Sequence, residues 1–169
     1  KPPSYFSRYD TEVWKVLQLV KDTQDENARI IWVTGEDEIG MRCTIQSACQ
    51  CLEDRLETNA IEGIFWIELR VHESLCNGRY QVPLHDVIRK VKKELYDQNM
   101  ILVLDATRLG YESVPLLVDK ISTLIETTEH IKFIIINSEP LHLTWNCEDR
   151  HITIPALGLE STVNIFCRL

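Results

Sequence analysis

The sequence predicts an α/β fold, a three-layer sandwich in which a central, mostly parallel five-stranded sheet lies between helices. Short apolar runs alternate along the chain with amphipathic segments, which is the order that builds parallel strands joined by helices. The runs 30–33 and 131–136 are apolar on both faces, as strands buried between two helix layers are. A chain of 169 residues is long enough for one such domain with a sizeable core.

Each element follows from its own local pattern. Residues 1–9 are expected to form an extended lead-in, because Pro2 and Pro3 oppose a helix. Asp10 can cap the helix that follows, in which apolar residues recur at helical spacing. The same reasoning predicts helices over 11–22, 44–56, 84–96 and 114–125 and from 159 onward, and strands over 30–33, 64–71, 100–104, 131–136 and 151–154.

Charge and composition exclude some classes of function. The net charge is −8, so the domain lacks the positive field that attracts nucleic-acid backbones. The basic residues within 89–93 spread around a helix, which indicates a solvated face. The six cysteines show no C-x-x-C spacing and are expected to be reduced thiols of an intracellular protein. No apolar run approaches the ~18 residues of a membrane span.

Ligands of such folds bind outside the carboxyl ends of the strands, so the residues after each strand are candidates for function. After the strand 30–33, Gly35 and Gly40 have the spacing of a phosphate-binding loop, G-x-x-x-x-G-K-[S/T]. Met41 stands where the lysine is expected and Arg42 where the hydroxyl is expected. Three carboxylates at 36–38 would repel phosphate, and Cys43 and Thr44 are weak substitutes for the hydroxyl.

Two other strand ends carry polar residues. Asp105 ends an apolar strand, where it either contributes to a Mg²⁺ site or caps the next turn, and Ala106 follows it. Asn137 and Ser138 follow the strand 131–136, where they can hydrogen-bond to a terminal phosphate. The histidines show no metal-ligand spacing, and His72 beside Glu73 at 72–75 is interpreted as a loop contact.

The order of these motifs resembles the NB-ARC domain, the ATPase module of plant disease-resistance receptors and apoptosome scaffolds. That family belongs to the STAND branch of AAA+-like P-loop NTPases. The resemblance implies the strand order 2-3-4-1-5 and, if a nucleotide binds, contacts from Phe6, Arg8, Asp105, Asn137 and Ser138. The segments that carry it are 5–8, 35–43, 64–67, 102–105, 134–139, and 154–157 followed by 163–166.

The sequence departs from the family pattern at the positions of the chemistry. Lysine is replaced by Met41, a hydroxyl residue by Arg42, a second aspartate by Ala106 and an arginine by Glu139. The resemblance therefore implies a degenerate, pseudo-NTPase module with no catalytic residues, no metal ligands and no enzyme activity. No cofactor is expected, with ADP or ATP and Mg²⁺ as the alternative.

The functional prediction follows from these departures. The chain 1–169 is expected to be one domain of a longer intracellular signalling or immune regulator, located in the cytoplasm with the nucleus left open. It would act as a scaffold or oligomerisation module that binds other domains, further copies of itself or signalling proteins. The alternatives are an ADP/ATP-binding conformational switch with weak or no hydrolysis and a nucleic-acid-binding module, which the net charge of −8 disfavours.

Overall fold

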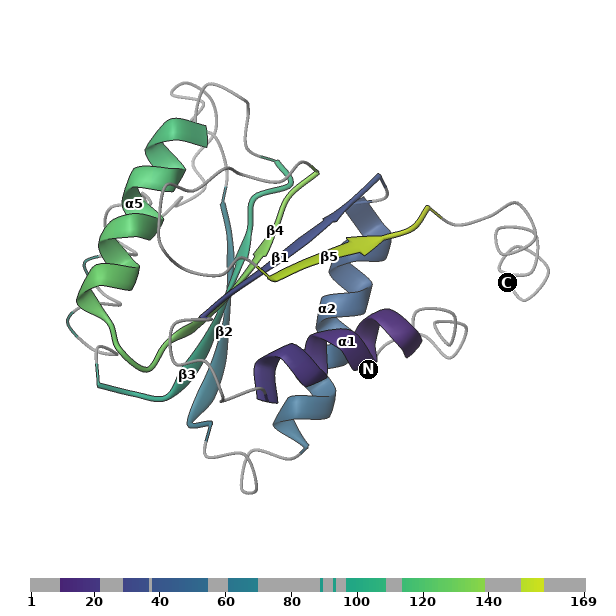
Figure 1. Cartoon of the computed structure of the whole chain (residues 1–169), viewed down its shortest axis with the longest axis horizontal. Helices are drawn as coiled ribbons and strands as arrows, with labels where there is room; N and C mark the ends of the chain where they lie inside the picture. Colours follow the sequence, from purple (N-terminus) through teal and green to yellow (C-terminus); the bar gives the residue numbers. More distant parts are fainter. Residues whose placement is uncertain are drawn as a thin grey trace, which may run out of the picture.

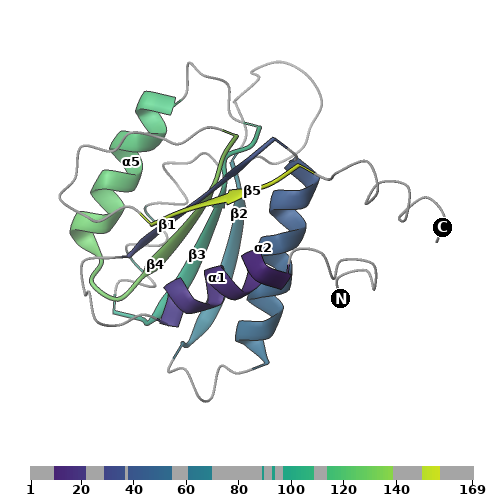
Figure 2. The same ribbon diagram turned by 45° about the vertical axis from the view of Figure 1, so that its right-hand side comes forward.

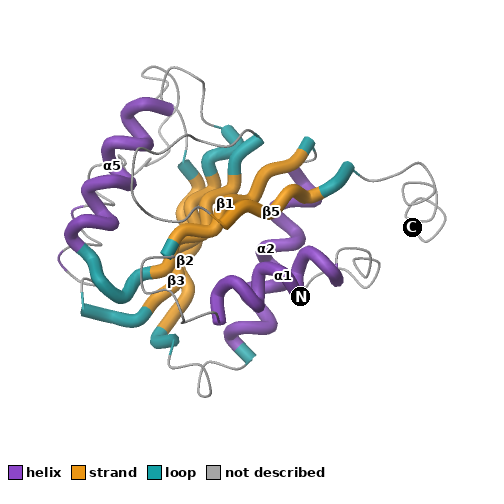
Figure 3. Tube along the Cα trace, in the orientation of Figure 1, coloured by secondary structure: helices purple, strands orange, loops and turns teal. Residues whose placement is uncertain are grey.

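A computed structural model describes residues 10–21, 29–36, 38–54, 61–69, 97–108, 114–138 and 150–156, together with Arg89 and Lys93. Figure 1 shows the chain coloured from one end to the other, and Figure 3 separates its helices from its strands. The elements are α1 (Asp10–Lys21), β1 (Ile30–Gly35), α2 (Glu38–Glu53), β2 (Gly63–Glu68), β3 (Met100–Asp105), α5 (Val114–Thr127), β4 (Lys132–Ile136) and β5 (Arg150–Ile154).

The five strands form one sheet in the order β2-β3-β4-β1-β5, and every neighbouring pair is parallel. The predicted strand order is therefore confirmed. Helices α1 and α2 lie on one face of the sheet and α5 lies on the other, as the two views in Figures 1 and 2 show. The carboxyl ends of the strands meet at one edge, where Asp105 is aligned with Glu68 on one side and Ile136 on the other.

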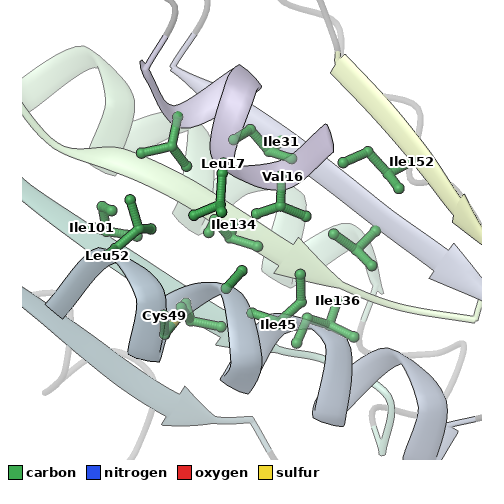
Figure 4. Packing of buried hydrophobic residues seen from close by; sticks show 14 of the residues in the cluster. Val16, Leu17, Ile31, Ile45, Cys49, Leu52, Ile101, Ile134, Ile136 and Ile152 are labelled. Carbon is green, nitrogen blue, oxygen red and sulfur yellow. The ribbon is translucent and has the colours of Figure 1, made fainter. Parts of the chain in front are cut away.

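Alternate residues of the central strands enter two separate cores, which is why these strands are apolar on both faces. Ile31 and Val33 of β1 face α1 and α2, whereas Ile30 and Trp32 pack toward α5. Figure 4 shows the first core, in which side chains of both helices meet the sheet. Its labelled members are Val16, Leu17, Ile31, Ile45, Cys49, Leu52, Ile101, Ile134, Ile136 and Ile152.

Two basic side chains tie helix ends to the sheet. The guanidinium of Arg29, just before β1, donates hydrogen bonds to the carbonyl of Ile125 at 2.7 Å and to that of Thr128. The ammonium of Lys132 on β4 donates to the carbonyl of Val20. The last carbonyls of a helix lack intrahelical partners, and a cation there also interacts favourably with the helix dipole. These contacts fix the ends of α5 and α1 against the strands.

Several predicted boundaries were wrong. The predicted helix 44–56 begins at Glu38, so that Gly40–Cys43 are helical rather than part of a loop. Strand β1 continues to Gly35, because its last residues pair with β5. The predicted strand 64–71 is β2, whose last residue is Glu68. Asp10 is the first residue of α1 rather than a residue before it.

Other predictions lie outside the described residues. These are the lead-in 1–9, the loop contact of His72 and Glu73, and the helix from 159 onward. Of the predicted helix 84–96, only Arg89 and Lys93 are described, and both are helical. Among the helices of the described ranges, none has the length and apolar character needed to cross a membrane.

The thiol of Cys49 gives a pH-dependent prediction. Burial in the first core, with the charge of Glu53 adding to it, raises the pKa of Cys49 from 9.0 to about 12. The unfolded chain therefore loses this proton first, so stability should fall between pH 9 and 12 by about 1.4 kcal/mol per pH unit. Urea denaturation of Cys49→Ala should lack this part of the slope, whereas Cys51→Ala should retain it. If stability falls equally steeply with pH in the wild type, Cys49→Ala and Cys51→Ala, the Cys49 thiol is not the group responsible.

Candidate functional site

The described candidate residues lie around the carboxyl ends of β1, β3 and β4. The fold brings Arg42 against Asp105, and Met41 against the end of β1, where Gly35 lies. Asn137 is buried directly after β4, and its backbone N–H donates to the carbonyl of Val33 at 3.0 Å. Ser138 is exposed. The predicted nucleotide contacts Phe6 and Arg8 lie outside the described residues, as does Glu139.

Arg42 points from α2 to the ends of β2 and β3. Its Nε lies 2.6 Å from Oδ2 of Asp105, in an ion pair whose N–H is not aligned as a hydrogen bond. One Nη is 3.3 Å from Oε1 of Glu68 and donates to Oγ1 of Thr107 at 2.9 Å. The Asp105 side chain is only 2% exposed, whereas that of Arg42 is 21% exposed. A partly exposed guanidinium thus balances the charge of a buried carboxylate.

The other oxygen of Asp105 is also engaged. Oδ1 accepts the hydroxyl hydrogen of Thr107 at 2.7 Å and the backbone N–H of Thr107 at 3.2 Å. When an aspartate side-chain oxygen accepts a hydrogen bond from the backbone N–H two residues later, it closes a turn. Asp105 therefore caps the turn after β3, which is one of the two roles predicted for it from the sequence. Both carboxylate oxygens therefore have partners within the chain.

Met41 is part of the first hydrophobic core and is 1% exposed. A Cβ atom placed on Gly35 would lie 3.1 Å from Cγ of Met41 and 2.7 Å from the carbonyl oxygen of Ile154. Glycine is therefore needed at the end of β1 because β5 and Met41 approach so closely. Met41, which stands where a phosphate-binding loop has its lysine, therefore packs against the sheet.

The two substitutes for the missing hydroxyl lie one turn into α2. The hydroxyl of Thr44 is fully buried and donates to the carbonyl of Gly40 at 2.8 Å, a hydrogen bond within the helix. Cys43 is partly buried and is not in a disulfide. The Thr44 hydroxyl is therefore committed to the helix backbone rather than directed at a ligand.

Sequence reasoning missed three residues of this cluster: Glu68, Thr107 and Arg108. Glu68 ends β2, and Arg108 lies 3.1 Å from its Oε1 through Nη1. Because the strand was predicted to run to residue 71, the search after it began at residue 72, beyond Glu68. Glu68 is the last residue of its strand, and that position, like that of Asp105 on β3, is the signal that marks it. Thr107 and Arg108 follow Asp105 directly in the sequence, but no motif marks them.

The Mg²⁺ that the fold family implies does not fit this arrangement. Mg²⁺ binds oxygen atoms at 2.0–2.1 Å in near-octahedral geometry. Oδ2 of Asp105 already lies 2.6 Å from Nε of Arg42, and Oδ1 is held by Thr107. Within the described ranges, no group of three or more His, Cys, Asp and Glu side chains is arranged to hold a metal. The buried charge of Asp105 is balanced by a side chain instead.

Comparisons with known proteins support the fold at low sequence identity. No protein-family model matches the chain, and no curated protein matches it. Cdc6p from Pyrobaculum aerophilum superposes with a TM-score of 0.59 at 13% identity, over 99% of this chain and 50% of that one. The chain has an AAA+-like P-loop NTPase fold.

Two further structures agree with this assignment of the AAA+-like fold. PCH-2 from C. elegans gives a TM-score of 0.53 at 15% identity, over 94% of this chain and 46% of that one. A structure of Drosophila ORC bound to DNA and Cdc6 gives a TM-score of 0.53 at 9% identity, over 96% of this chain and 31% of that one. This chain therefore spans half or less of these three proteins, and identities this low show a common fold alone.

Proposed function

We propose that this AAA+-like domain is a pseudo-NTPase that has kept the fold and lost the phosphate and metal chemistry. The observation that carries the proposal is the ion pair between Arg42 and the buried Asp105. In the family that the sequence resembles, the corresponding aspartate lies on the metal-binding strand. Here its charge is already balanced by a side chain from α2, the helix that follows the glycine turn.

Neighbouring positions support the same proposal. Met41 is part of the hydrophobic core, and Thr44 donates its hydroxyl to Gly40. Ala106, which follows Asp105, is 1% exposed and packs in the second core, where it offers no polar group to position water. Losing one preorganised group commonly costs ~10²–10³ in rate, so the loss of several predicts negligible turnover.

The proposed role of such a domain is that of a scaffold or oligomerisation module within a longer STAND-type signalling regulator. This part of the proposal is supported by the resemblance to NB-ARC domains, and the comparisons extend only to the fold. A sheet with an apolar core on each face is a framework that can position other domains or other copies of the same domain. Its partners are proposed to be proteins rather than nucleic acid, because the net charge is −8.

Isothermal titration with ATP and with ADP, each with Mg²⁺, tests the proposal. We expect no saturable heat below a Kd of about 1 mM, which corresponds to ~4 kcal/mol of binding free energy. We also expect no release of phosphate from ATP above the rate measured in buffer without protein. Low micromolar binding together with turnover would overturn the proposal. Binding of ADP without turnover would instead favour the alternative, a nucleotide-dependent conformational switch.

A further inference from the structure

The contacts of Arg42 describe a small cation site that is occupied from within the chain. Three oxygen atoms surround the guanidinium: Oδ2 of Asp105 at 2.6 Å, Oγ1 of Thr107 at 2.9 Å and Oε1 of Glu68 at 3.3 Å. They come from β3, from the turn after it and from β2. The guanidinium itself belongs to a residue of helix α2 rather than to the sheet.

Electrostatics favour a cation at this place. Glu68 and Asp105 are register partners at the ends of two adjacent parallel strands, and Asp105 is almost completely buried. Two carboxylates so placed repel each other, and burial of one of them leaves that repulsion less screened by water. A positive group between them offsets that repulsion. Arg42 supplies it, and Arg108 adds a second contact to Glu68 from a side chain that is 50% exposed.

Carboxylate and hydroxyl oxygens are also the ligands that Mg²⁺ and Mn²⁺ prefer. A guanidinium 2.6 Å from Oδ2 would repel a metal ion that lay 2.0–2.1 Å from the same oxygen, because both are positively charged. We propose that Arg42 is a built-in cation, which fills a latent divalent-cation site formed by Asp105, Glu68 and Thr107 and makes the folded domain independent of metal. This inference deepens the proposed function, because it gives a physical reason why a metal-bound nucleotide is not accepted.

The experiment titrates Mn²⁺ alone, without nucleotide, into the 169-residue chain and follows free Mn²⁺ by electron paramagnetic resonance. The wild-type domain should show no saturable binding. Arg42→Ala should bind Mn²⁺ at least about tenfold more tightly, because the three oxygen atoms become available. The double variant R42A/D105N should lose this gain, and Arg42→Lys, which keeps a cation at the site, should never acquire it.

Stability provides a second readout in case Arg42→Ala folds poorly. Mn²⁺ should raise the melting temperature of Arg42→Ala, or restore its far-ultraviolet circular dichroism, and should leave the wild type unchanged. The inference is overturned if the wild type binds Mn²⁺ as tightly as the variant does. It is also overturned if Arg42→Ala and a second neutral variant, Arg42→Gln, gain neither affinity nor stability from Mn²⁺. The proposed pseudo-NTPase function fails separately, on turnover by the wild type.

Discussion

The Arg42→Ala variant is expected to be about 3 kcal/mol less stable than the wild-type domain, at the lower end of the ~3–5 kcal/mol cost of orphaning a buried charge. The substitution leaves the carboxylate of Asp105 unpaired, although its side chain is only 2% exposed. The lower end applies because Arg42 itself is 21% exposed, so water can reach part of the vacated space. Urea denaturation monitored by circular dichroism measures the difference.

Two further variants show whether the loss comes from this charge pair. Arg108→Ala removes a cation that also pairs with Glu68 but is 50% exposed, so we expect a cost within about 1 kcal/mol. Combining Arg42→Ala with Asp105→Asn removes both charges, and the double variant should be more stable than the sum of the two single losses predicts. If the stability losses of the two single variants add up to that of the double variant, Arg42 and Asp105 do not stabilise each other, whatever their distance.

The sequence was sufficient for the architecture because the relevant signal is local and repeated. Apolar runs such as 100–104 and 131–136 correspond to β3 and β4. The order of the strands also agrees with the sheet, but that prediction came from the resemblance to NB-ARC domains and not from the local patterns. Burial on both faces leaves no polar alternation in such strands, so the apolar run itself identifies them. Boundaries were less accurate, as at the start of α2, because Gly40 was interpreted as part of a loop although it lies in a helical turn.

The site was harder to predict because its key contact joins residues far apart in the chain. The sequence placed Arg42 one position beyond the expected lysine but gave no direction for its side chain. Only the packing of α2 on the sheet brings the guanidinium to Asp105, 63 positions later in the sequence and on another strand. Glu68 was missed for the related reason that the end of β2 was placed too late.

Met41→Lys, which restores the residue type expected in a phosphate-binding loop, should destabilise this domain by about 2–4 kcal/mol at pH 7. Met41 is 1% exposed and belongs to a core of apolar side chains, so the new ammonium group would lose its hydration without gaining a phosphate. Burial would depress the pKa of that lysine, and the unfolded chain would then bind more protons than the folded one between that depressed pKa and pH ~10. Since stability rises with pH where the unfolded state holds more protons, the deficit relative to wild type should shrink between pH 6 and 9.

Met41→Leu is the matched control, because it preserves the apolar character and nearly the volume of the side chain. Its cost should stay below about 1.5 kcal/mol and should not change with pH. Denaturation curves of both variants at several pH values separate the effect of charge from the effect of shape. If Met41→Lys is as stable as Met41→Leu at every pH, the lysine ammonium reaches a polar cavity. The loop at Gly35 would then have kept room for a phosphate, and the case for an inactive site would rest on Arg42 and Asp105 alone.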